Sequence, residues 1–132
     1  MQTYTVALFG EAEKGDYQKP FLCQSVAQLL DLFGNPPLNS QGIYYAIQAL
    51  LFQHALLFFR VKEEGFSYED YLCGLHLLQK QTFIPRIDAV CLPGVGNMEI
   101  IGALTPIIEI YHSLLITNES DFYDYLTLTS CR

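Results

Sequence analysis

Five glutamates follow segments that are patterned as β-strands, where carboxylates can hold a cation or meet a basic partner. They are Glu11, Glu13, Glu63, Glu64 and Glu119. Because ligands gather at the carboxyl ends of the strands in an open parallel sheet, we expect these side chains to converge on one rim. Clustered carboxylates can bind Mg²⁺. However, no Asp-x-Asp pair marks a strand end, and a charged run after a strand is typical of a solvated loop. We therefore predict a partner-binding rim and no metal.

Tyrosine is the second group with a potential role in binding. The chain has 9 Tyr and 9 Phe, and most of them fall in the apolar stripes of expected helices. Four tyrosines exceed what one helix face can bury: Tyr44, Tyr45, Tyr123 and Tyr125. Since aromatic residues are enriched at protein interfaces, we expect some of these four to contact a protein partner.

Arrangements typical of catalysis are weak in this sequence. His54, His76 and His112 do not share one helix at metal-ligand spacing, and no G-x-S-x-G motif accompanies them. Cys73 and His76 have the spacing of a nucleophile and its base, but no third residue is available to orient them. The glycine-rich segment 92–97 follows a strand and opens a helix, yet it matches neither phosphate-binding motif, and turn formation explains it better. We predict no catalytic residues and no cofactor.

The four cysteines show no C-x-x-C spacing, which argues against zinc binding and thioredoxin-like redox chemistry. Cys23 and Cys91 lie in apolar, strand-like runs, so we expect both to be buried and unpaired. The first residues lack the charged and apolar regions of a signal peptide. Reduced cysteines and no leader together predict a cytoplasmic protein.

Composition excludes several classes of protein. The 132 residues suit a single domain, 1–132, and 51% hydrophobic against 16% charged residues excludes disorder. A net charge of −7 repels a phosphate backbone, so we expect no nucleic-acid partner. The longest apolar runs are far shorter than the roughly 20 residues that a bilayer requires, so we expect no membrane span.

The elements that must position these residues alternate between strand and helix. Strands are expected at Thr3–Phe9, Phe21–Gln24, Ala55–Val61, Asp88–Leu92 and Leu114–Thr117. Helices are expected to begin at Ser25 (with Gln28 completing a capping box), Ser40, Ser67, Asn97 and Asn118–Ser120. Pro106 should kink the fourth helix. This order predicts a three-layer α/β fold, with a mainly parallel sheet of about 4–5 strands, Ala55–Val61 central, and helices on both faces.

The order of several short motifs resembles a known family. The motifs lie at 8–15, 19–20, Ser25, 32–35, 46–47 and 58–61, followed downstream by 71–75, 87–94 and the closing strand. In this order they resemble the central α/β domain of contractile phage tail sheath proteins. The resemblance implies an α/β fold, assembly with protein subunits, and a place in a virion or injection apparatus. The sequence contains no counterpart of the sheath's C-terminal domain, and Asn118 replaces the usual acid of the last strand. Polymerisation therefore does not follow from the resemblance.

We expect a non-enzymatic protein-interaction or assembly module that binds other proteins or copies of itself. One alternative is a small acidic binding module similar to a secretion chaperone, although such chaperones favour antiparallel sheets. The other alternative is a metal-dependent enzyme with its site at the carboxyl ends of the strands.

Overall fold

The computed structural model describes residues 4–130, except for the side chain of Ser130, and is built on a five-stranded sheet with the order β2-β3-β1-β4-β5. Its strands are β1 (Thr5–Gly10), β2 (Phe21–Cys23), β3 (Ala55–Arg60), β4 (Ala89–Cys91) and β5 (Leu114–Ile116). β3, β1, β4 and β5 are parallel, and β2 pairs antiparallel with β3 at one edge. The expected α/β fold with a mainly parallel sheet is confirmed.

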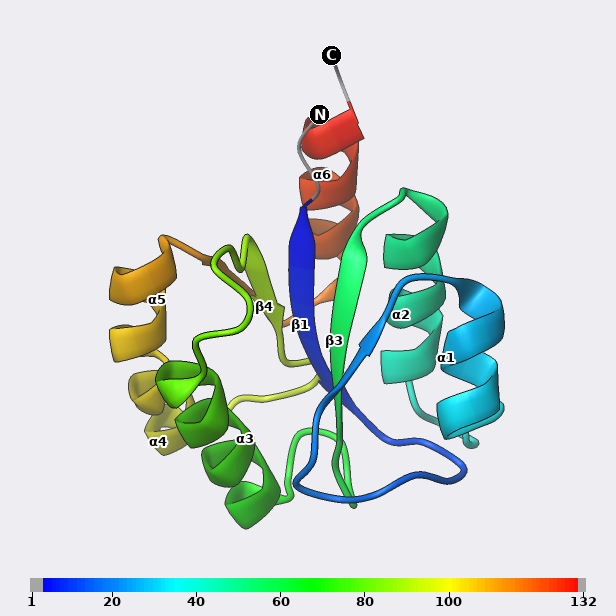
Figure 1. Cartoon of the computed structure of the whole chain (residues 1–132). Coiled ribbons are helices and arrows are strands. Elements are labelled where there is room, and N and C mark those ends of the chain that lie inside the picture. The colour runs from blue at the N-terminus through cyan, green and yellow to red at the C-terminus, as the bar shows by residue number, and fades with distance from the viewer. Residues whose placement is uncertain (1–3, 131–132) are drawn as a thin grey trace.

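Helices cover both faces of the sheet (Figure 1). One face carries α1 (Val26–Phe33), α2 (Gly42–Leu51) and α6 (Glu119–Ser130), and the other carries α3 (Tyr68–Lys80), α4 (Met98–Ala103) and α5 (Thr105–Tyr111). The connection from β1 to β3 carries α1 and α2 across one face, and the connections from β3 to β4 and from β4 to β5 carry α3, α4 and α5 across the other. The sheet therefore separates two apolar cores.

Consecutive strand residues supply these two cores in alternation. In β1, Val6 and Leu8 face α1 and α2, whereas Ala7 and Phe9 face α3. The unbroken apolar run in β3 is explained in the same way, since both of its faces are covered. β3 is an interior strand, as expected, but the middle position belongs to β1.

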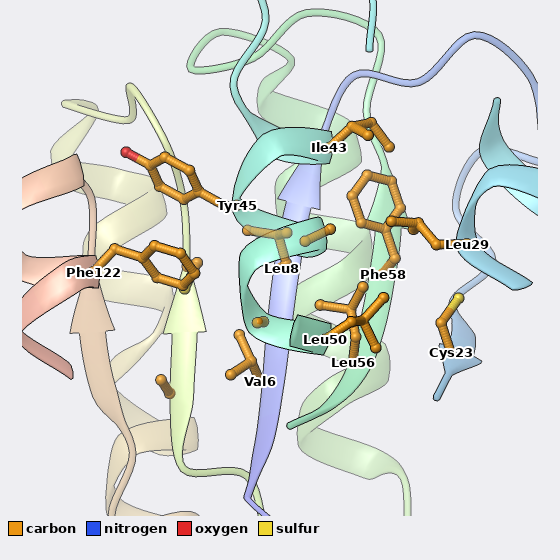
Figure 2. Close-up of a cluster of buried hydrophobic side chains, with 14 of the residues drawn as sticks. Val6, Leu8, Cys23, Leu29, Ile43, Tyr45, Leu50, Leu56, Phe58 and Phe122 are labelled. Carbon is orange, nitrogen blue, oxygen red and sulfur yellow. The ribbon is translucent and has the colours of Figure 1, made fainter. Parts of the chain in front are cut away.

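Stacked aromatic rings join two helices on one face of the sheet and two neighbouring strands on the other. Phe122 of α6 stacks on Tyr45 of α2, with ring centroids 4.6 Å apart, in the cluster that Figure 2 shows. On the other face, Phe9 stacks on Phe59 at 4.3 Å. Each such pair contributes about 0.5–1.5 kcal/mol beyond the area that it buries.

Three of the five expected helix starts have a side-chain cap: Ser25, Asn97 and Asn118, whose side chain accepts a hydrogen bond from the Asp121 N–H (2.9 Å). The Ser25 hydroxyl accepts a hydrogen bond from the Gln28 N–H (3.1 Å), and the Asn97 side chain accepts from the Glu99 N–H (2.8 Å).

Ser67 stands at the N-cap position of α3, as expected, but its side chain caps no helix N–H group, and α2 begins at Gly42 with Gln41 rather than Ser40 at its N-cap. The Ser40 hydroxyl donates to the Pro37 carbonyl, and the Ser67 hydroxyl bonds to the backbone of Glu63. Both serines stabilise the turn before the helix and leave the N–H groups of the helix to other acceptors.

Pro106 breaks the expected fourth helix rather than kinking it. The chain forms two short helices, α4 and α5, and Pro106 stands in the first turn of α5. Proline is favoured there because it has no N–H to leave unpaired.

Cys23 and Cys91 are buried and free, as expected, whereas Cys131 lies outside the described residues. Burial raises the pKa of the Cys23 thiol to about 11. No helix in residues 4–130 combines the length and the hydropathy needed to cross a membrane.

His54 is a buried polar residue that connects α6 to the loop between α2 and β3. Its ring nitrogens lie 3.1 Å from the Phe52 carbonyl and 3.1 Å from the Thr129 hydroxyl, and its ring stacks on Tyr4. Burial lowers the pKa of His54 below its usual 6.5, against the opposing effects of the Phe52 carbonyl and the Asp88 carboxylate. The neutral imidazole is therefore the form that the fold requires.

This arrangement predicts a specific pH dependence of stability. The unfolded chain binds the proton near pH 6.5 and the folded chain only below it, so the contribution of His54 is complete above pH 6.5 and decreases as the pH falls toward the lowered pKa. Replacing His54→Gln should cost about 1–2 kcal/mol at about pH 7.5, and the difference from wild type should shrink at about pH 5. Urea denaturation at both pH values measures it, with exposed His76→Gln as the control. If the stability difference between wild type and His54→Gln were the same at both pH values, His54 would not be the source of this pH dependence.

Candidate functional site

The carboxylate of Glu64 joins three segments at the carboxyl edge of the sheet. Its Oε1 accepts a hydrogen bond from the Gln41 N–H (2.9 Å), and its Oε2 accepts from the N–H groups of Gly42 (2.8 Å) and Glu11 (2.9 Å). Gln41 and Gly42 form the start of α2, and Glu11 directly follows β1. Glu64 therefore supplies the cap that Ser40 does not, and it places a negative charge at the positive end of the helix dipole.

Glu11 completes this junction from the opposite side. Its Oε2 accepts a hydrogen bond from the Glu64 N–H at 2.9 Å, so each glutamate binds the backbone of the other. Gly10 and Gly42 make the close approach possible, because a Cβ on either glycine would lie 2.7 Å from the Cα of the other. We call this arrangement of Gly10, Glu11, Gly42 and Glu64 the glutamate junction.

A polar cavity of about 370 Å³ opens beside the glutamate junction. It lies at the carboxyl edge where β1 and β4 are adjacent but their connections run in opposite directions, which is the usual ligand position in such sheets. Neither a lysine nor an arginine lines it. Its walls are Asn39, Gln41, Tyr45, Glu64, Pro93, Gly94, Thr117, Asn118 and Glu119.

Tyr45 turns its hydroxyl toward this cavity. The side chain is only 5% exposed, and Figure 2 shows the hydroxyl oxygen pointing away from the apolar cluster toward the arrowhead end of the strands. The hydroxyl has no hydrogen-bond partner among the described residues. Burial, followed by the negative charge of Glu119, raises the pKa of Tyr45 to about 12. The hydroxyl is therefore protonated at neutral pH, so that it can both donate and accept a hydrogen bond.

A second hollow of about 350 Å³ adjoins the first and shares Gln41, Tyr45 and Glu119 with it. Its other walls include Tyr44 and Tyr123, which are 58% and 45% exposed. We call the two hollows together the acidic–aromatic cleft. Five residues singled out in the sequence meet there, from α2, the loop after β3, and α6: Tyr44, Tyr45, Glu64, Glu119 and Tyr123.

The other expected site residues lie elsewhere. The Glu13 carboxylate accepts a hydrogen bond from the Asn35 N–H (3.1 Å) just beyond the end of α1, and exposed Glu63 borders a different hollow beside α3. Tyr125 is buried, and its ring meets that of His54 edge-on at 5.4 Å. Glu11 stays within the glutamate junction. The predicted single rim of five glutamates is therefore divided into separate places.

An apolar groove of about 520 Å³ on the opposite face was not predicted from the sequence. It opens between β2, β3 and the carboxyl-terminal half of α3, where the sheet has no further helix to cover it. Lys80 is its one charged wall residue within the described chain. The walls are Pro20, Leu22, Leu57, Phe59, Leu77, Leu78, Lys80, Gln81, Phe83 and Ile84.

The loop after α3 holds Phe83 out beside this groove in a fixed conformation. The Gln81 side chain accepts from the Ile84 N–H and donates to the Ile84 carbonyl, both at 2.8 Å, and also donates to the Tyr111 hydroxyl. Phe83, between these contacts, is 92% exposed. The only sign of this feature in the sequence was an apolar residue in an expected loop, and such residues are too common to predict a binding surface.

Within residues 4–130, no group of three or more His, Cys, Asp or Glu side chains could hold a metal ion. Comparisons with protein-family models, with curated proteins and with solved structures found no match.

The glutamate junction predicts unequal roles for two adjacent acids. Glu64→Gln removes the charge and one acceptor oxygen from a group with three N–H partners, and should destabilise the fold by about 2–4 kcal/mol. Exposed Glu63→Gln, one residue away, should change stability by less than about 0.5 kcal/mol. Urea denaturation of the two variants at neutral pH makes the comparison, and equal effects would show that the junction contributes little.

Proposed function

We propose that this protein is a non-enzymatic protein-interaction module that binds a protein partner on the apolar groove. The observation that carries the proposal is Phe83, 92% exposed on a loop fixed by Gln81 beside a mostly apolar groove. Exposed aromatic anchors next to apolar hollows are typical of binding hot spots. Because the loop is already ordered, little conformational entropy is lost when a partner binds.

The charges around the groove indicate the chemistry of the partner. The chain carries a net charge of −7, yet no carboxylate lines the groove, and Lys80 stands on its wall. Lys19 precedes Pro20 at its margin and lies with its Nζ 5.7 Å from the centre of the Phe21 ring. An amphipathic segment with apolar side chains and flanking carboxylates fits this surface, since complementary charges fix orientation and speed association.

Binding is favoured over catalysis because backbone N–H groups at the carboxyl edge of the sheet already have hydrogen-bond acceptors within the protein. In many α/β enzymes, free backbone N–H groups at this edge hold a substrate phosphate. Here Glu64 occupies the N–H groups at the start of α2, and the Gly94 N–H donates to the Thr117 carbonyl (3.3 Å). Cys73 and His76 make no hydrogen bond with each other, so the nucleophile–base pair considered from the sequence gains no support.

A sheath-like assembly role is the finer form of this proposal and depends on the order of motifs in the sequence. If it is correct, the gene should lie beside genes for a tube, a baseplate or a secretion apparatus. Neighbours of unrelated metabolic function would contradict the sheath-like role, while leaving the groove open to other partners.

The groove proposal is tested by site-specific photo-crosslinking in the native host. A benzophenone side chain replacing Phe83 should give a discrete adduct, whereas the same group replacing Gln79, exposed on α3 outside the groove, should not. Mass spectrometry identifies the adduct, and the partner is then purified and its affinity measured.

With that purified partner, Phe83→Ser should weaken binding by at least about thirtyfold, as expected for a hot-spot residue. The matched control is Phe66→Ser, since Phe66 is 73% exposed but does not line the groove. Equal affinity of the two variants, or equal crosslinking from both positions, would overturn the proposal.

A further inference from the structure

We propose that the acidic–aromatic cleft binds the guanidinium group of an arginine side chain that a protein partner presents. This contact is separate from the apolar groove, lies on the other face of the sheet, and does not depend on the groove being occupied.

The cleft has negative charge that the described chain does not neutralise. Glu64 and Glu119 line it and no basic residue does. The ion pair that residues 4–130 contain joins Arg86 to Asp88, which precedes β4 and so lies at the opposite edge of the sheet. Glu64 uses three of about four acceptor positions in the glutamate junction, which leaves one for a ligand.

The Tyr45 hydroxyl is the second, independent sign of a ligand. It belongs to a residue that is only 5% exposed, lines both hollows of the cleft, and has no hydrogen-bond partner within the described chain, so the hydroxyl is open to the cleft rather than enclosed in the core. A donor placed between Glu119 and Tyr45 would satisfy both. The cleft therefore offers several acceptors and has no cationic donor among its wall residues.

Geometry favours a guanidinium over other cations. An arginine side chain presents five N–H donors in a plane, which suits several acceptors on different walls. It also stacks on aromatic rings, and the exposed rings of Tyr44 and Tyr123 border the cleft. A lysine ammonium gains less from these flat rings. A metal ion would need more ligating side chains than the described residues bring together here.

The test is an NMR titration of the full chain with three short peptides that differ at one position. N-acetylated, C-amidated Gly-Arg-Gly carries the guanidinium, Gly-Lys-Gly carries an ammonium, and Gly-citrulline-Gly is the neutral isostere of the first. The arginine peptide should shift the backbone amides of Gln41, Gly94 and Asn118 saturably. The citrulline peptide should bind at least about tenfold more weakly, and the lysine peptide should lie between them.

Variants then locate the site. Glu119→Gln should weaken the arginine peptide about tenfold, and Tyr45→Phe, which keeps the ring on Phe122, should weaken it about fivefold. Asp124→Asn is the matched control, an exposed carboxylate on α6 outside the cleft, and should bind as wild type does. Raised salt should weaken the arginine peptide, since the screening length falls from about 10 Å at 0.1 M to about 3 Å at 1 M.

Several results would overturn the assignment. Equal binding of the arginine and citrulline peptides would show that charge is not recognised, and equal binding of the arginine and lysine peptides would remove the role of the aromatic rings. Unchanged affinity in Glu119→Gln would place the contact elsewhere. Tighter binding of spermidine or Mg²⁺ than of the arginine peptide at the same amides would identify a site for a free cation.

Discussion

The hydrogen bonds from three backbone N–H groups to the Glu64 carboxylate determine how the carboxyl edge of this protein is built. They connect the end of β1, the loop after β3 and the start of α2, which are far apart in the sequence. A helix start and two strand ends would otherwise leave N–H groups that require a solvent or ligand acceptor. Because Glu64 accepts these hydrogen bonds, the three N–H groups are paired within the protein. The close contact between Gly10 and Gly42 allows the segments to come near enough for this pairing.

The acidic–aromatic cleft depends on a second condition, the return of α6 to the face that α1 and α2 already cover. Phe122, Tyr125 and Leu126 of α6 are buried in that core, and Phe122 stacks on Tyr45. This stack holds the Tyr45 ring so that its hydroxyl faces the cavity, while the first turn of α6 brings Glu119 to the same place. At the far end of α6, the bond between His54 and Thr129 fixes the helix again. The cleft is therefore a product of how α6 is docked.

The sheet also determines how the two surfaces differ in charge. The face of α2 and α6 ends in glutamates, whereas the apolar groove at the β2–β3 margin is bordered by Lys19 and Lys80. Arg60 and Lys62 stand at the carboxyl end of β3 near the ring of Tyr17, with the Arg60 guanidinium carbon 4.2 Å from its centre. Four basic side chains of the described chain therefore lie near the β2–β3 side of the sheet, whereas Arg86 pairs with Asp88 before β4. The two proposed partners, which differ in charge, would bind different surfaces.

Local sequence patterns were sufficient to predict most of the secondary structure, because helix caps and strand runs depend on interactions between residues that are close in the sequence. The apolar run of β3, the Ser25 and Asn97 caps and the alternation of strands with helices all belong to this class. The patterns failed where a distant group replaced a local one: Ser40 does not cap α2 because Glu64, 22 residues beyond Gly42, already accepts the N–H groups there. Pro106 shows another limit of local patterns. Proline inside a helical pattern predicts that the helix cannot continue unchanged, but it does not distinguish a kink from a break into two helices.

For the candidate site, the sequence supplied residue types and only tertiary structure decided which of them meet. Glu63 and Glu64 are adjacent in the chain, yet one borders α3 and the other closes the glutamate junction, since the backbone turns between them. Tyr45 and Tyr123 are far apart in the chain and share a cleft because α2 and α6 pack on the same face of the sheet. Sequence patterns did not predict the groove because its walls come from β2, β3, α3 and the loop after α3, which only the tertiary packing brings together. The groove arises from the way the layers pack, and no single segment of the sequence contains a pattern for it.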